Sequence, residues 1–292
     1  MNVLARAALV AVLALALAGC RARPVFDSPY PGEAPTALAR GTLAEFAALL
    51  QARTRQHPHL ARQGRVVIEV PSEGAKMWFE GNILVRDDPP AVRLRGSRVP
   101  IGTLFEVCVR GDAAWVYLNR EREVFTGSAR ALRETTGLAG SVSLRELVAS
   151  ILVMQDLRER LARPGQWTMY RTRREVLLAV EEPGGRRLAW RIRRHDGLVR
   201  EFVTFDARGA AELRVTYESW VLEDGEPLPG QFVAEVQDGA VRLTLRLDQY
   251  KLGQPIADAV FDELPRGAQS FFGLEQLAGR ESVIPEGGEE AP

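Results

Sequence analysis

The feature that most constrains the fold is a long series of segments in which apolar residues alternate with polar ones. From residue 65 to residue 250 much of the chain has a period of two, the spacing of strands with one buried and one solvated face. The clearest segment is 241–250, where four aliphatic side chains alternate with polar ones: Val241, Leu243, Leu245 and Leu247. Asp-Gly and Arg-Gly pairs between segments suit hairpin turns. The pattern predicts one antiparallel sheet of about ten or eleven strands.

Two other segments have helical spacing instead. Thr42 and Glu45 form a predicted capping box, followed by an apolar face at Leu43, Phe46, Ala47 and Leu50. Ser143 and Glu146 form a second one, which opens a helix predicted to continue to Leu161, before Pro164. A sheet of this size curls, and these helices are the elements available to cover its apolar concave face. The expected fold is α+β, mostly β: an unclosed half-barrel with an apolar cavity.

The residues expected to line that cavity are apolar side chains of the concave face and of the second helix. They are Phe79, Ile83, Val107, Trp190, Val215, Tyr217, Leu243 and Leu245 from strands, with Leu147 and Ile151 from the helix. An alternative interpretation has the abundant Phe, Trp and Leu side chains fill the concavity completely. A cavity below about 300 Å³, the lower end for ligand pockets, would favour this alternative.

The N-terminus has the pattern of an export signal. Arg6 precedes the apolar run 7–18, which is shorter than the roughly 20 residues of a membrane-spanning helix. The run ends in Leu17-Ala18-Gly19-Cys20, which resembles the lipobox of bacterial lipoproteins and implies lipidation of Cys20. An ordinary signal peptide with an unrelated cysteine is the alternative. The expected organisation is a signal peptide at 1–19, a lipidated Pro-rich tether at 20–41, the half-barrel at 42–270 and a tail at 271–292 with a disordered end.

Charge and motifs give no indication of chemistry. Acidic and basic residues balance at 38 each, so nucleic acid is not an expected partner. No nucleophile elbow, metal-binding spacing or nucleotide-binding glycine motif is present, so we predict no catalytic residue, metal or cofactor. His57, His59 and His195 are expected in loops, and Cys108 as a small packed side chain. The arginine-rich run 186–200 has two interpretations. It is either a patch that binds anionic lipid or the solvated face of two strands, and we prefer the second.

Three stretches, in this order, resemble a known family. They are the strand-turn-strand segment 92–127, the capped helix 143–152 and the strand-and-hairpin segment 215–252. Over about residues 42–265 the chain is similar to the LolA/LolB-like lipoprotein-localisation superfamily, above all to the outer-membrane receptor LolB. The resemblance implies an unclosed barrel whose helical lid covers a cavity for acyl chains. It also implies lipoprotein or lipid trafficking at the periplasmic face of the outer membrane, with Arg21 after Cys20 favouring that membrane.

The resemblance further implies partners and one surface residue. The first partner is the membrane, which the chain contacts through its N-terminal lipid. The ligand is an acyl chain or a lipoprotein, and a periplasmic carrier protein is the third partner. Ile101, in the turn Val99–Gly102, matches an exposed leucine of the receptor, so it either contacts the membrane or is a buried turn residue. The chain departs from the receptor by the addition of residues 253–268. A structural envelope lipoprotein with a packed, ligand-free half-barrel is the second functional hypothesis.

Overall fold

A computed structural model describes residues 36–37, 40–55, 59–71, 74–86, 89–135, 144–163, 165–172, 174–236 and 239–279. The predictions for the signal peptide, Cys20, Arg21, most of the tether, His57 and Ser143 lie outside these residues, as does the end of the tail. Within them, no helix is long and apolar enough to cross a membrane.

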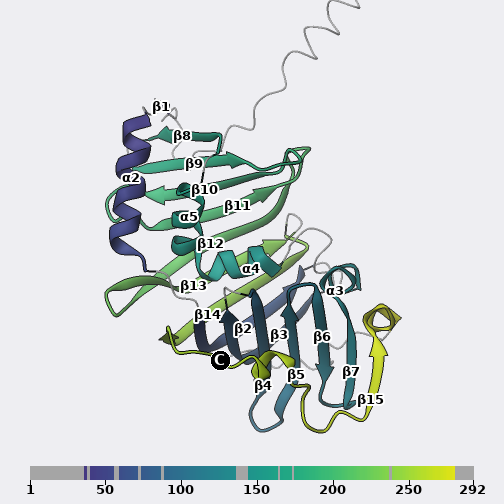
Figure 1. Ribbon diagram of the computed structural model, residues 1–292. Coiled ribbons are helices and arrows are strands. Elements are labelled where there is room, and N and C mark those ends of the chain that lie inside the picture. Colours follow the sequence, from purple (N-terminus) through teal and green to yellow (C-terminus); the bar gives the residue numbers. More distant parts are fainter. Residues whose placement is uncertain are drawn as a thin grey trace, which may run out of the picture. The chain divides into compact units, whose positions relative to one another are not determined.

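The described residues form one sheet with the strand order β1-β8-β9-β10-β11-β12-β13-β14-β2-β3-β4-β5-β6-β7-β15 (Figure 1). The first seven strands are β1 Thr36–Ala37, β2 His59–Val70, β3 Ala75–Arg86, β4 Ala91–Arg98, β5 Gly102–Arg110, β6 Ala113–Leu118 and β7 Glu123–Ser128. The others are β8 Trp167–Arg171, β9 Glu175–Glu181, β10 Arg187–Arg193, β11 Val199–Phe205, β12 Ala211–Glu223, β13 Glu226–Val236, β14 Val241–Leu252 and β15 Ser270–Gly273.

The sheet confirms the α+β half-barrel, with more strands than predicted. All neighbouring strands are antiparallel except β7 and β15, which are parallel, so the sheet is mixed. Two-residue β1 and four-residue β15 are too short to show an alternating pattern, which is why the sequence did not predict them. β15 begins at residue 270, where the half-barrel was expected to end, and β1 lies within the expected tether.

Helices of the described chain pack on the sheet in two groups, apart from the short helix Ala259–Asp262, which contacts β4 and β5. They are α2 Arg40–Arg53, α3 Ala129–Thr135, α4 Leu144–Ile151, α5 Val153–Leu161, α6 Ala259–Asp262 and the 3-10 helix η2 Leu274–Gly279. α5 contacts β11, α2 and α4, and it lies in front of the strands β9–β12 in Figure 1. α3 and η2 contact each other and β7, at the opposite end of the strand order. The main core therefore lies between the first group and the sheet.

Both predicted helices need correction in detail. α2 begins at Arg40, so Thr42 lies inside the first turn and is not the N-cap. The helix predicted from 143 to 161 is two helices, because Leu152 has φ −102° and ψ 34°. Near the break, the hydroxyl of Tyr217 donates a hydrogen bond of 2.8 Å to the carbonyl of Ser150. Apolar spacing continues through Leu152, so periodicity could not reveal the break.

A row of glycines crosses the middle of the sheet, where Gly64, Gly81 and Gly96 are register partners on β2, β3 and β4. A Cβ atom on Gly64 would lie 2.3 Å from the carbonyl oxygen of Arg246 on β14. At Gly96 it would meet the ring of Phe105 at 2.5 Å. The missing side chains therefore allow close approach of β14 to β2, and let Phe105 lie across β4.

The expectation that polar strand residues face solvent is wrong on part of the outer face. Arg93 on β4 and Glu106 on β5 are 9% and 3% exposed. Residues 254–268, here called the C-terminal strap, pack over them, and Phe261 of the strap forms a small core with Cys108 and Trp115 of the strands. The strap has no strand periodicity. Alternation therefore predicted which residues share the outer face, but not that part of this face is covered and kept from water.

Candidate functional site: the concave apolar face

One apolar row crosses nine neighbouring strands on the concave face. Each member is the register partner of the next: Met169, Leu178, Trp190, Phe202, Val215, Ala234, Leu243, Ile68 and Met77. Side chains that are directly opposite on paired strands lie about 5 Å apart, so the row is continuous. Three of the predicted liners, Trp190, Val215 and Leu243, belong to it.

The other predicted liners fall in rows parallel to this one. Tyr217, Phe232, Leu245, Val66 and Phe79 are successive register partners on β12, β13, β14, β2 and β3. Ile83 and Val107 belong to a further row, linked through Leu94. Ile151 is 1% exposed and belongs to the same core as the first two rows. The side chain of Leu147 lies outside what the structure describes.

Burial changes along the nine-strand row. Its members on β9 to β13 are at most 2% exposed: Leu178, Trp190, Phe202, Val215 and Ala234. Its members on β14, β2 and β3 are only half-buried: Leu243, Ile68 and Met77. Leu94, Phe105 and Val107 on β4 and β5 are half-buried too. The concave face is thus closed at one end and partly uncovered toward the middle of the strand order.

Aromatic side chains fill the closed end. The ring of Trp190 stacks on Phe202 with centroids 5.4 Å apart and packs against Trp167 at 5.7 Å. Tyr217 lies 5.8 Å from Phe232, and burial raises its pKa well above 10, with a contribution from Asp156. The phenol therefore stays protonated at any physiological pH and keeps its hydrogen bond to Ser150. These contacts fix the end of α4 on the sheet.

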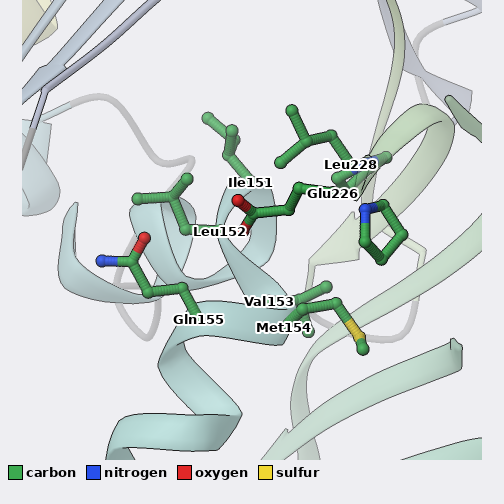
Figure 2. A pocket seen from close by; sticks show the side chains of 9 residues that line it. Ile151, Leu152, Val153, Met154, Gln155, Glu226 and Leu228 are labelled. Carbon is green, nitrogen blue, oxygen red and sulfur yellow. The ribbon is translucent and has the colours of Figure 1, made fainter. Parts of the chain in front are cut away.

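A small void lies at the break between α4 and α5. Figure 2 shows the Glu226 carboxylate between Leu228 and the helix turn at Ile151 and Leu152. Glu226 is 5% exposed and accepts a hydrogen bond from the backbone N–H of Arg55 at 3.2 Å. The void holds only about 10 Å³, close to the space of a single water molecule. At this place helix and sheet are packed together, without the open apolar cavity expected from the sequence.

The lining of this void includes residues that the sequence did not single out as liners: Leu152, Val153, Gln155, Glu226, Pro227, Leu228 and Pro229. Pro227 and Pro229 lie in β13, next to a turn. Leu152 sits at the break, which apolar spacing does not indicate. The half-buried Ile68 and Met77 could have been found, because both follow the period-two pattern of their strands.

The turn between β4 and β5 is exposed and apolar. Val99 is 86% exposed and Ile101 is 63% exposed. The interpretation of Ile101 as a buried turn residue is therefore wrong. Its contact with a membrane stays a prediction.

The remaining candidates have structural surroundings. His195 is 73% exposed, as expected of a turn residue. Cys108 is buried, and desolvation raises its thiol pKa from 9.0 to about 11. In the arginine-rich run, Arg191 and Arg200 lie 3.8 and 3.3 Å from carboxylate oxygens of the buried Glu175. Desolvation raises the pKa of Glu175, against the lowering effect of both arginines. These arginines thus neutralise a buried charge.

The described residues contain no group of three or more Asp, Glu, His or Cys side chains that could bind a metal ion.

Comparison with solved structures identifies the fold. A DUF1329 family protein from Desulfovibrio piger superposes with a TM-score of 0.54 at 12% identity, covering 76% of this chain and 96% of that one. A putative outer membrane lipoprotein-sorting protein domain from Vibrio parahaemolyticus gives 0.52 at 10% identity, covering 75% and 95%. A LolA superfamily protein from Nitrosomonas europaea gives 0.45 at 15% identity, covering 77% and 98%. No family model matches the sequence, and no curated protein matches it.

The chain therefore has a LolA/LolB-like fold, as its order of motifs indicates. The class of protein that this fold defines is a half-barrel with a helix layer on its concave face.

Proposed function

We propose that this domain binds acyl chains of lipids or lipidated proteins on its concave face, and that it acts by binding and not by catalysis. The observation that carries the proposal is the apolar row across nine strands, buried at one end and only half-buried at Leu243, Ile68 and Met77. An apolar surface that continues beyond the helices covering it is a place where another molecule can bind. The likeness to a putative lipoprotein-sorting domain supports the same class of ligand.

Binding requires that the helix layer moves, because the void beneath the α4–α5 break is only about 10 Å³. α4 and α5 have eight and nine residues, too short to be stable helices without their packing. Leu152, between them, is the natural hinge. An acyl chain contributes about 0.8 kcal/mol for each methylene that it buries, so a palmitoyl chain would offset the loss of several helix-to-sheet contacts.

The proposed location is the periplasmic face of the outer membrane, with the domain anchored by lipid on Cys20. Lipoprotein or lipid delivery to that membrane, and a periplasmic carrier as partner, follow from the same proposal. The exposed Ile101 turn suits a contact with the bilayer surface. The fold-level likeness to a lipoprotein-sorting domain supports an envelope role.

One specific observation favours the second candidate function, a structural envelope lipoprotein without ligand. The 10 Å³ void lies far below the roughly 300 Å³ of a ligand pocket. In that case the stacked aromatic residues of the closed end are the filling of a permanent core.

Titration with palmitate separates these functions. A fragment that begins at Thr36 contains every described strand and helix and forms one compact unit. We expect saturable binding of about one palmitate per chain, weakened by Leu243→Gln on the concave face. Arg242→Gln is the matched control, since Arg242 is the neighbouring residue on the outer face and is exposed. Absence of saturable binding would overturn lipid handling and leave the structural role.

A further inference from the structure

The outer face of the sheet contains a second and much larger hollow, here called the outer cavity. Its volume is about 500 Å³, within the range of roughly 300–1,000 Å³ typical of small-molecule sites. Its floor comes from β4, β5 and the end of β6, and its wall from the C-terminal strap. Arg93, Arg95 and Glu106 alternate along their strands with residues of the concave core, so the outer cavity lies on the opposite side of the sheet from the proposed acyl site.

A buried carboxylate lies in the floor of this cavity. Glu106 is 3% exposed, and both of its oxygens are engaged by arginines. Arg93 donates from Nε to Oε2 at 2.9 Å, and Arg95 donates from Nε to Oε1 at 2.9 Å. The negative charge of Glu106 therefore lies between the positive charges of Arg93 and Arg95, so the floor of the cavity has a net charge of one positive unit.

Arg93 fixes the floor to the wall. Its Nη1 donates to the carbonyl oxygen of Val260 in the strap, and its guanidinium lies 5.2 Å from the ring of Trp115. Farther along, Arg86 pairs with Asp258 and Arg110 pairs with Asp262. These connections hold the strap over the sheet, so the cavity has a built wall.

Arg95 is placed differently from Arg93. Its side chain is 47% exposed, and within the described chain only its Nε has a partner. Its two terminal nitrogens are left as a planar pair of donors, the geometry that matches a carboxylate or a phosphate. Tyr117 donates from its hydroxyl to Asn119 Oδ1 at 3.0 Å, which leaves the Asn119 amide nitrogen as a further donor beside the cavity.

The rest of the lining completes an amphipathic site. The charged members are three arginines and two carboxylates: Arg93, Arg95, Arg266, Glu106 and Glu263. Their net charge is one positive unit. Val260, Leu264 and Pro265 give the wall an apolar surface. An anion at Arg95 with an apolar group toward this wall would satisfy both features.

We propose that the outer cavity binds a small molecule that bears a carboxylate or phosphate group and an apolar part, with Arg95 as the principal anion-binding residue. This site is separate from the concave face and does not depend on the proposed acyl-binding function. The apolar wall selects against free inorganic anions, because they leave the Leu264 surface in water.

Calorimetric titration of the full chain in detergent, at fixed ionic strength, tests the proposal with hexyl phosphate, hexanoate and inorganic phosphate. We expect hexyl phosphate to bind one per chain and more tightly than inorganic phosphate. Arg95→Gln should weaken binding roughly tenfold or more, because it removes charge-assisted hydrogen bonds. Arg242→Gln is the matched control, since Arg242 is equally exposed at 46% and should change the affinity less than twofold.

A second variant tests the wall. Leu264→Ser, at a side chain 37% exposed, should weaken hexyl phosphate and leave inorganic phosphate unchanged. If phosphatidylglycerol vesicles compete with hexyl phosphate, the natural ligand is a lipid headgroup. If they do not compete, the natural ligand is a soluble anion. Both results agree with the proposed site. The proposal is overturned if neither organic probe binds, or if Arg95→Gln and Arg242→Gln have equal effects.

Discussion

The two faces of the sheet differ in how they use space. Beneath the α4–α5 break the concave face leaves a void of about 10 Å³, whereas the strap leaves about 500 Å³ over the outer face of β4 and β5. Apolar contacts have no preferred direction, so Trp190, Phe202 and their neighbours approach until the space is filled. Arg93 is held on the strands by Glu106 at 2.9 Å, and its Nη1 donates to the carbonyl oxygen of Val260 in the strap. Because hydrogen bonds have a preferred length and direction, this link holds the strap at a set distance from the strands.

The polarity of a sheet face therefore does not determine how completely the space over that face is filled. Beneath the α4–α5 break the apolar side is filled, and the helix layer there must move to bind a ligand. The charged side is hollow without any movement. Variants at matched positions of the two faces test whether the faces differ in this way.

The largest expected effect is on the concave face. Trp190→Ala should lower the free energy of unfolding by about 3–5 kcal/mol, because Trp190 is 1% exposed and stacks on Phe202. Trp78 is the control on the outer face, where its ring lies between Arg65 and Arg98 at 5.0 and 4.8 Å. Trp78→Ala should cost about 1 kcal/mol. Urea unfolding measures both, and equal losses would contradict the contrast between the faces.

The outer cavity should depend on its buried charge. Glu106→Gln should lower the free energy of unfolding by about 2–3 kcal/mol, because two arginines lose a charged acceptor. Glu80→Gln is the control: that carboxylate is 37% exposed and lies 3.5 Å from Arg65, so its loss should cost less than about 1 kcal/mol. Thermal unfolding of both variants checks this. If Glu106→Gln left the free energy of unfolding unchanged, the ion pair between Glu106 and the two arginines would not stabilise the structure around the cavity.

Cys108 reports whether the strap covers the outer face. In a fragment from Thr36 it is the single thiol, and its pKa is raised from 9.0 to about 11 by burial. At pH 8 its thiolate fraction is about a hundredfold below that of the unfolded chain, so alkylation should be slower by at least that factor. The folded state binds the proton more tightly, so the contribution of Cys108 to stability should be constant below pH 9 and fall as the pH rises toward 11. Rapid native alkylation would show that the strap opens readily.

The smallest effect on stability is expected at the exposed turn. Ile101→Ser should change the free energy of unfolding by less than about 0.5 kcal/mol, since the side chain is 63% exposed. It should nevertheless reduce sedimentation of the domain with lipid vesicles. Leu222→Ser, at a side chain 75% exposed in β12, is the control that should leave vesicle binding unchanged. Equal loss in both variants would remove the special role of Ile101.

The concave face could be predicted from the sequence because period-two alternation states which residues share a face. Val215 and Leu243 are twenty-eight residues apart, yet the pattern assigned both to the lining, and the register places them in one row. The break at Leu152 could not be predicted, since the apolar spacing continues through it and the hydrogen bond beside it comes from Tyr217, a distant residue. The outer cavity escaped prediction for a similar reason: Arg93 and Glu106 are buried by the strap, whose sequence has no strand pattern.

If the helix layer over the concave face moves and admits an acyl chain, the protein isolated from cells should contain one. Native mass spectrometry of the full chain, isolated from the membranes of producing cells, determines whether a lipid is bound in addition to the proposed anchor. We expect one non-covalently bound, acyl-bearing molecule per chain, with reduced occupancy in Leu243→Gln and unchanged occupancy in Arg242→Gln. A chain that carries no such molecule, and acquires none when palmitate is added, would contradict this expectation.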